Sequence, residues 1–146
     1  MEPRLDYYAA SPGAMKAMLI LEAMTGNLTI EQPLLHLIKI RASQLNGCAF
    51  CTDMHSIDAR RLGETDRRLY SIVVWRSSGF FTPREKAALA WTEALTSLTD
   101  GEVSDEVYQQ LEAYFSETER VDLTMAINVI SSWNRLAVGF RQKPCT

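Results

Sequence analysis

The sequence predicts an all-α fold in a single domain over residues 1–146. Helix start and stop signals recur along the whole chain, and no stretch shows the alternating β-branched pattern of a half-buried strand. A chain of 146 residues with 47% apolar and 23% charged residues can bury a core of its own. We therefore expect about seven helices, no sheet and no linker between domains.

Three helices are predicted in the first part of the chain. The first covers residues 11–24 and opens with Ser11 and Pro12, an N-cap followed by a first-turn proline. The second covers residues 30–46 and ends at an Asn-Gly pair. The third covers residues 49–62, and its paired arginines suit the negative end of the helix dipole.

Four further helices are predicted at residues 65–75, 82–98, 104–115 and 116–139. Thr82 and Ser116 each stand three residues before a glutamate, which is the capping-box pattern of a helix start. The tail 141–146 lacks apolar periodicity, so we expect it to be loose, with Cys145 in it.

Charge and hydropathy exclude several classes of protein. A net charge of -3 and a pI near 5.4 argue against nucleic-acid binding, and no apolar run reaches the roughly 18 residues that span a membrane. The N-terminus has no apolar region typical of a secretory signal, so we expect a cytoplasmic, reducing location. Three cysteines make a poor disulfide framework there, and the C-x-x-C pair is expected to be catalytic or metal-binding.

The C-x-x-C pair consists of Cys48 and Cys51, in the first turn of the third helix, with His55 one turn further on. All three side chains are expected on one stripe of that helix. A helix N-terminus lowers the pKa of a thiol from about 8.5, and His55 can take the proton of Cys51. Cys51 is therefore the predicted nucleophile, and Cys48 can attack the oxidised Cys51 to close a disulfide. This arrangement fits peroxide reduction.

Two other interpretations of the cluster stay open. The cysteines could be buried core residues, although burial alone does not account for His55. His36, Cys48, Cys51 and His55 also form a Cys2His2 set that could hold zinc or serve a redox sensor without turnover. Three of the four lie within two turns of one helix, whereas zinc ligand pairs are usually separated by a turn or loop. We therefore expect no metal and no permanently bound organic cofactor.

The run 34–55, together with residues 91–95 and 132–135, strongly resembles the AhpD-like alkylhydroperoxidases of the carboxymuconolactone decarboxylase superfamily. The motif of that family is a glutamate, eleven residues, C-x-x-C, three residues and a histidine, and its cysteines and histidine coincide with Cys48, Cys51 and His55. The resemblance implies a helical trimer or hexamer that reduces hydroperoxides to alcohols with electrons from an external dithiol or disulfide reductase. It also implies that the second cysteine becomes the sulfenic acid and the first is proton donor and resolver. A lactone-acid decarboxylase is a rival within the superfamily, disfavoured by the C-x-x-C pair.

One position departs from the family pattern, because His36 stands where the family has its relay glutamate. We expect His36 to carry protons in that role, with thiol activation failing at a higher pH, since its reference pKa is about 6.5 against about 4.3 for glutamate. Glu93 is the next relay candidate, although it is more readily explained as an ion-paired residue. Asp53 and Asp58 are expected to face solvent.

Large apolar side chains are abundant for a chain of this size, with six Met and three Trp. The tryptophans Trp75, Trp91 and Trp133 are expected to anchor the core or a subunit interface. Short helices cannot bury all of these side chains in one small core, which favours a homo-oligomer.

Overall fold

The computed structural model describes residues 2–144, and over that range it is all-α, as predicted, with no strand. Its α-helices are α1 (Tyr7–Ala10), α2 (Pro12–Thr25), α3 (Gln32–Leu45), α4 (Ala49–Arg61), α5 (Asp66–Ser71), α6 (Pro83–Thr96), α7 (Asp105–Tyr114) and α8 (Glu117–Phe140). Two 3-10 helices, Ile72–Val74 and Leu98–Asp100, follow α5 and α6. Most helix ends lie within two residues of their predicted start and stop signals. The helix predicted over residues 65–75 is shorter, because α5 ends at Ser71 and the chain continues as a 3-10 helix.

The capping boxes at Thr82 and Ser116 are both formed, each with reciprocal side-chain and backbone hydrogen bonds. Helix α1 is the element that the sequence did not predict. It is only four residues long, and the side chain of Asp6 caps it by accepting the backbone N–H groups of Tyr8 and Ala9. A single turn has no room for the apolar periodicity on which helix prediction depends.

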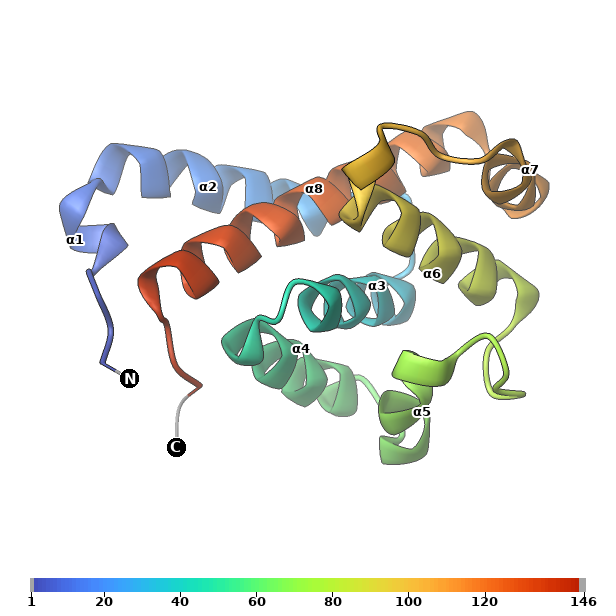
Figure 1. Cartoon of the computed structure of the whole chain (residues 1–146), viewed down its shortest axis with the longest axis horizontal. Coiled ribbons are helices and arrows are strands. Elements are labelled where there is room, and N and C mark those ends of the chain that lie inside the picture. The colour runs from blue at the N-terminus through green and yellow to red at the C-terminus, as the bar shows by residue number, and fades with distance from the viewer. Residues whose placement is uncertain (1, 145–146) are drawn as a thin grey trace.

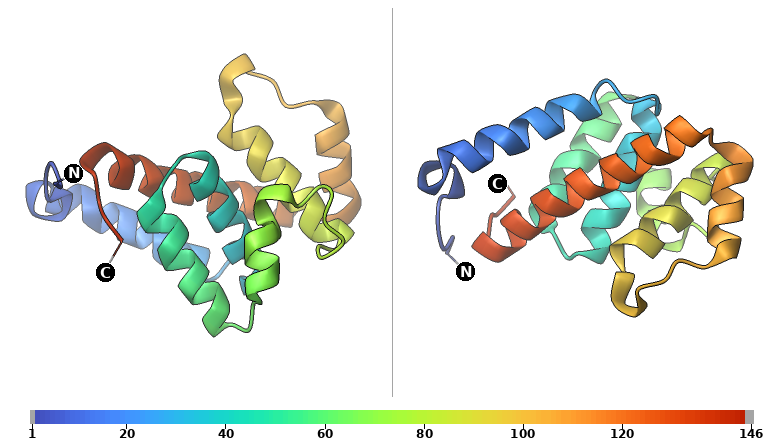
Figure 2. Two further views of the ribbon diagram at one scale, coloured as in Figure 1. Left: turned by 60° about the horizontal axis from the view of Figure 1, so that its bottom comes forward. Right: turned by 90° about the horizontal axis from the view of Figure 1, so that it is seen from above.

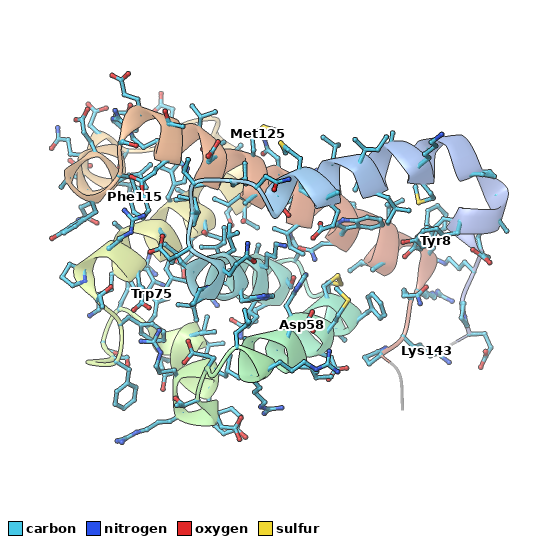
Figure 3. The ribbon with its side chains drawn as sticks, turned by 180° about the vertical axis from the view of Figure 1, so that it is seen from behind. Tyr8, Asp58, Trp75, Phe115, Met125 and Lys143 are labelled. Atoms are coloured by element: carbon cyan, nitrogen blue, oxygen red, sulfur yellow. A yellow bond between two sulfur atoms is a disulfide. The ribbon has the colours of Figure 1, made fainter. Side chains whose placement is uncertain are left out.

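Helix α3 lies at the centre of the molecule, with α8 above and α4 below it in Figure 1 and α6 alongside. Its Leu37 and Ile38 are fully buried against apolar side chains such as Leu89 of α6 and Leu123 of α8. Each such side chain contributes about 1.5–3 kcal/mol through burial. Figure 3 shows side chains filling the spaces around α3. The central helix is thus held rigidly against three neighbours.

Helix α2 runs beside the second half of α8, as the view from above in Figure 2 shows. The N-terminal segment is tied to the end of α8, because the Arg4 guanidinium donates to the carbonyl of Gly139 and the Arg4 backbone N–H to that of Phe140. Tyr8 stacks on Trp133 of α8 at a ring-centroid distance of 6.4 Å. The α1–α2 hairpin and α8 therefore face the start of α4 across α3.

The chain leaves α8 through a C-terminal turn at the start of the tail. Arg141 ends α8 with a φ of 60°, and the backbone N–H of Gln142 donates to the carbonyl of Ala137 at 2.8 Å. This is a helix C-terminal hydrogen bond that a sequence without glycine at this position does not signal. Cys145 lies outside the described residues. Among the described helices, none is long and apolar enough to cross a membrane.

Candidate functional site

The two cysteines of the C-x-x-C motif form a disulfide at the start of α4, with a Cα–Cα distance of 5.4 Å. The chain turns out of α3 at Gly47, whose φ of 65° favours glycine, and enters α4 immediately. Cys48 is the N-cap, one position before the predicted first turn, and its Sγ accepts the backbone N–H of Cys51 at 3.2 Å. A backbone N–H in this position stabilises negative charge on a sulfur atom.

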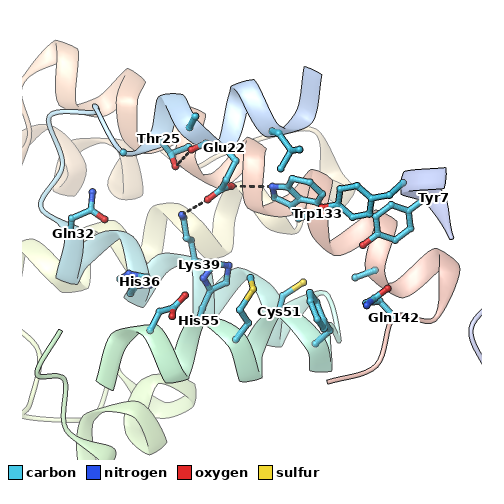
Figure 4. A pocket seen from close by; sticks show the side chains of 18 residues that line it. Tyr7, Glu22, Thr25, Gln32, His36, Lys39, Cys51, His55, Trp133 and Gln142 are labelled. Carbon is cyan, nitrogen blue, oxygen red and sulfur yellow. Dashed lines mark hydrogen bonds and ion pairs between the residues drawn. The ribbon is translucent and has the colours of Figure 1, made fainter. Parts of the chain in front are cut away.

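A pocket of about 570 Å³ lies between α2, α3, α4 and α8, with Cys51 in its wall (Figure 4). Its apolar and aromatic lining includes Tyr7, Tyr8, Leu19, Phe50, Met54 and Trp133. The polar groups gather around His36, His55 and the pair Glu22 and Lys39. Cys48 is absent from this pocket and lines a separate hollow. Only Cys51 therefore faces the polar groups that could support chemistry.

His36 and His55 lie together in the pocket, with ring centroids 6.0 Å apart and ring planes at 52°. The Nδ1 atoms of both are buried without a hydrogen-bond partner. Burial lowers the pKa of His55 to about 3, with smaller contributions from the positive charge of Lys39 and from His36. Burial, and then Lys39, also lower the pKa of His36. Both imidazoles are therefore neutral near pH 7 while the disulfide is closed, and each can accept a proton.

Lys39 and Glu22 are functional candidates that the sequence analysis missed. The Nζ of Lys39, a side chain that is only 8% exposed, lies 3.0 Å from Glu22 Oε1. The other oxygen of Glu22 accepts the Nε1–H of Trp133 at 3.0 Å, so one carboxylate joins α2, α3 and α8 over the pocket (Figure 4). A signal was present in the sequence, because Glu22 interrupts the most apolar run of its helix and Lys39 stands between Ile38 and Ile40.

Among the remaining candidates, Asp58 and Trp133 have a position that the sequence analysis did not predict, because both line the pocket. Asp53 is exposed, as expected, but Asp58 is half-buried and lines the pocket below the histidines. Trp133 also lines the pocket, so its role is local as well as structural. Glu93 is remote from the pocket lining and lies in an ion-paired cluster, 2.7 Å from the Nε of Arg41. This position disfavours Glu93 as the alternative relay residue.

The zinc interpretation requires several ligands to converge on one point. Within residues 2–144, no group of three or more His, Cys, Asp or Glu side chains is placed to hold a metal ion. In the disulfide form both sulfurs are bonded to each other, and Cys48 and Cys51 line different surfaces. The geometry described is that of a disulfide with Cys51 in the wall of a pocket.

Comparisons with known proteins agree with this geometry. The sequence model of the carboxymuconolactone decarboxylase family matches residues 12–94. The uncharacterized protein YdfG of Bacillus subtilis is 44% identical over 139 residues, which are 95% of each chain. The crystal structure of a protein of unknown function from Agrobacterium tumefaciens, suggested to be the antioxidant defence protein AhpD, is 41% identical, with a TM-score of 0.96 over 99% of each chain.

A more distant structure shares the fold. The debrominase Bmp8 is 21% identical, and its TM-score is 0.85 over 94% of this chain and 74% of that one. A likeness at that level of identity extends to the arrangement of helices and no further. The family match and the two closer relatives together carry the assignment: the chain belongs to the carboxymuconolactone decarboxylase family, as an AhpD-like member.

Proposed function

We propose that this protein is a thiol-dependent peroxidase that reduces organic hydroperoxides to alcohols. The observation that carries the proposal is the Cys48–Cys51 disulfide at a helix N-terminus, with Cys51 facing an apolar pocket that also contains two neutral histidines. A reversible disulfide, a pocket for an organic group and proton acceptors are what peroxide reduction by a dithiol requires.

The oxidative half-reaction uses the reduced protein. The Cys51 thiolate attacks the outer oxygen of the hydroperoxide, an S–O bond forms, the O–O bond breaks, and the alkoxide leaves and takes a proton to become the alcohol. The Cys48 thiolate then attacks the sulfur of the Cys51 sulfenic acid, an S–S bond forms, and hydroxide leaves and is protonated to water. The N–H of Cys51 that points at Cys48 Sγ favours the thiolate needed for this second step.

The histidines act as proton carriers in this cycle. His55 lies one turn from Cys51 on α4 and accepts the thiol proton, and His36 on α3 exchanges it onward through the pocket. The low pKa of His55 belongs to the disulfide form, in which burial and the positive charge of Lys39 outweigh the opposing charge of Asp58. When the Cys51 thiolate appears, its charge favours the imidazolium, so the protein takes up a proton as the disulfide is reduced.

The proposal extends to the molecule's partners and location. An external dithiol or disulfide reductase returns the disulfide to two thiols, which fits a reducing cytoplasm. The molecule assembles into a homo-oligomer, for which a trimer or hexamer is our expectation. Exposed apolar side chains support this, among them Ile20, Tyr70 and Val74, which are 62%, 70% and 56% exposed. Light scattering that returned a monomer mass at micromolar concentration would contradict the assembly.

The decisive experiment follows single-turnover oxidation of the reduced protein by cumene hydroperoxide, with alcohol formation and thiol loss measured together. One alcohol and one Cys48–Cys51 disulfide should form per chain. Cys51→Ser should abolish both, whereas Cys48→Ser should still yield one alcohol and a sulfenic acid that a dimedone probe traps. Probe labelling that survives in Cys51→Ser would reverse the two roles. Full alkylation of both cysteines after peroxide treatment would refute the proposal.

Two rival functions give other results in the same assay. A redox sensor would form the disulfide but would not turn over repeatedly when dithiothreitol and hydroperoxide are supplied together. A zinc protein would carry about one metal ion per chain after purification under reducing conditions, which elemental analysis measures. Repeated turnover by metal-free protein excludes both.

A further inference from the structure

The two cysteines of the disulfide are buried, each 2% exposed, and line different hollows of the molecule. Cys51 lines the apolar pocket, whereas Cys48 lines a second hollow, also of about 570 Å³. The second hollow is formed by the end of α3 and one side of α4, with the lining Ser43, Gln44, Gly47, Cys48, Ala49, Thr52, Asp53, Ser56 and Arg60. Neither cysteine belongs to the lining of the other's hollow.

The α4 residues of the two linings lie on opposite faces of that helix, whereas Cys48 is the N-cap and precedes the helix. At 3.6 residues per turn, positions 51, 54, 55 and 58 fall on one face of the helix, and positions 49, 52, 53, 56 and 60 fall on the opposite face. The disulfide at the start of α4 therefore lies between the two hollows. A reagent in one hollow does not occupy the other, and each hollow has one of the two cysteines in its lining.

We propose that the protein uses its disulfide from two sides: the reducing dithiol binds in the Cys48 hollow and attacks Cys48, while hydroperoxide reaches Cys51 from the apolar pocket. This inference rests on the proposed peroxidase function and adds the site and class of the electron donor. A thiolate attacks a disulfide through a mixed-disulfide intermediate, on the extension of the S–S bond beyond the attacked sulfur. For a donor in the second hollow, that sulfur is Cys48.

The reductive steps balance as follows. A donor thiolate bonds to Cys48 Sγ, the Cys48–Cys51 bond breaks, and Cys51 leaves with the electron pair as a thiolate inside the peroxide pocket. The second donor thiolate attacks the donor sulfur of the mixed disulfide, the donor closes its own disulfide, and Cys48 leaves as a thiolate. The backbone N–H of Cys51 stabilises this leaving group, which speeds its departure. Two electrons pass to the protein, and the two donor protons pass to His55 and solvent.

The lining of the second hollow indicates the kind of dithiol that fits. Its polar groups are mostly uncharged hydroxyl and amide side chains, with one carboxylate, Asp53, and one guanidinium, Arg60. The aromatic walls of the Cys51 pocket have no counterpart there. A narrow, uncharged, hydrogen-bonding dithiol therefore matches the Cys48 hollow, whereas an apolar hydroperoxide matches the other. Dithiothreitol has the required chemistry and serves as the probe.

The attacked sulfur can be identified in the unmodified protein. The disulfide form, prepared with diamide so that no peroxide is involved, is mixed with excess 2-mercaptoethanol, quenched in acid within milliseconds and alkylated with N-ethylmaleimide. Tandem mass spectrometry of the 48–51 peptide should place the mercaptoethanol adduct on Cys48 and the alkyl group on Cys51. An adduct on Cys51 overturns the proposal.

A pair of matched substitutions tests the two approaches kinetically. Thr52→Trp fills the Cys48 hollow, and Leu19→Trp introduces the same side chain at the 50%-exposed edge of the Cys51 pocket. Thr52→Trp should slow reduction of the disulfide by dithiothreitol at least tenfold and leave oxidation of the reduced protein by cumene hydroperoxide within twofold. Leu19→Trp should show the opposite pattern.

Several outcomes overturn the two-sided approach. Unchanged dithiothreitol kinetics in Thr52→Trp contradict it, as does equal slowing of both half-reactions in a variant whose circular dichroism and unfolding midpoint match the parent. Failure of the proposed function looks different, because the reduced parent protein would not react with hydroperoxide at all. The position of the mercaptoethanol adduct would still be measurable in that case.

Discussion

The polar groups on the two sides of helix α3 differ in whether they have hydrogen-bond or ion-pair partners. Toward α6, the carboxylate of Glu93 is paired with Arg41 and Arg76 and accepts the indole N–H of Trp75. Toward α4, the Nδ1 atoms of His36 and His55 are buried with no partner, beside a pocket. A buried polar group without a partner costs about 1–3 kcal/mol. The paired groups on the α6 side therefore stabilise the fold. On the α4 side, the unpaired imidazoles lower the stability, but their Nδ1 atoms remain free to bind protons.

The largest predicted effect is a decrease in the free energy of unfolding in acid, because His55 binds a proton more readily in the unfolded chain than in the folded protein. Its folded pKa of about 3 lies below the unfolded value of 6.5, so the unfolded chain binds more protons between these pH values. Stability is fully present above pH 6.5, falls as the pH drops, and levels off below the folded pKa. The loss should reach about 3 kcal/mol by pH 4 and at most about 5 kcal/mol in total.

Urea unfolding of the disulfide form at a series of pH values measures this effect. His55→Asn, which keeps a polar side chain, should lose most of the decrease between pH 6.5 and pH 4. His36 contributes in the same direction, because its pKa is also lowered. Parallel stability curves for the parent and His55→Asn would show that the histidine titrates normally and that the α4 side carries no such cost.

The next effect concerns the opposite side of α3. Glu93→Ala leaves the guanidinium of Arg41, a side chain only 13% exposed, without its carboxylate and also removes the acceptor of Trp75. Removing one partner from such a largely buried pair should destabilise the fold by about 3 kcal/mol. The rate of Cys51 oxidation in the folded variant should change less than twofold. A large loss of rate with normal stability would instead make Glu93 a relay residue.

Sequence patterns predicted features that lie within one helix better than contacts between helices. The sequence located seven of the eight described α-helices, and most exactly the starts of α6 and α8, because a capping box is a property of four consecutive residues. Helix α5 ends at Ser71, earlier than predicted, because the chain continues as a 3-10 helix. The placement of Cys51 and His55 in one pocket was also accessible, since both lie on one helix at a spacing of four. Local chemistry was therefore predictable wherever one helix carried it.

Contacts between distant helices were not predictable in the same way. The carboxylate that joins Lys39 to Trp133 comes from Glu22, 17 residues before the lysine and 111 before the tryptophan. Nothing local marks such a partner, because the pairing depends on how α2 and α8 cross over α3. The Asp58 side chain is 39% exposed and paired with Arg61 of its own helix, and its place at the pocket depends likewise on how the helices pack. The sequence did contain one indication of these contacts, because Glu22 and Lys39 are charged residues within apolar stretches.

A third effect tests His36 as a proton carrier. His36→Ala should slow single-turnover disulfide formation by a factor on the order of 100, which is the low end for one positioned acid or base. Because burial and Lys39 lower the pKa of His36, its acid limb should lie below pH 6.5, and His36→Glu should move that limb less than reference values indicate. Rates measured against pH for the three proteins check this. Three superimposable profiles would reduce His36 to a packing residue.

The smallest effect belongs to the charge pair above the histidines. Lys39→Met removes a buried positive charge that faces the pocket of Cys51, so the Cys51 thiolate loses electrostatic support. Glu22 already offsets much of this charge, so the thiol pKa should rise only modestly, with a loss of alkylation rate on the order of tenfold at a fixed pH below that pKa. Iodoacetamide alkylation of reduced Cys48→Ser protein, followed against pH, isolates the Cys51 thiol.

The companion substitution Glu22→Gln should act in the opposite direction. The glutamine oxygen can still accept the Nε1–H of Trp133, but the charge of Lys39 is no longer offset, so the Cys51 pKa should fall. Lys39→Arg preserves the charge and should keep the parent profile, which separates charge from packing. If Lys39→Met and Glu22→Gln shifted the thiol pKa in the same direction, the pair would act by holding α2 against α3 and not by its electric field.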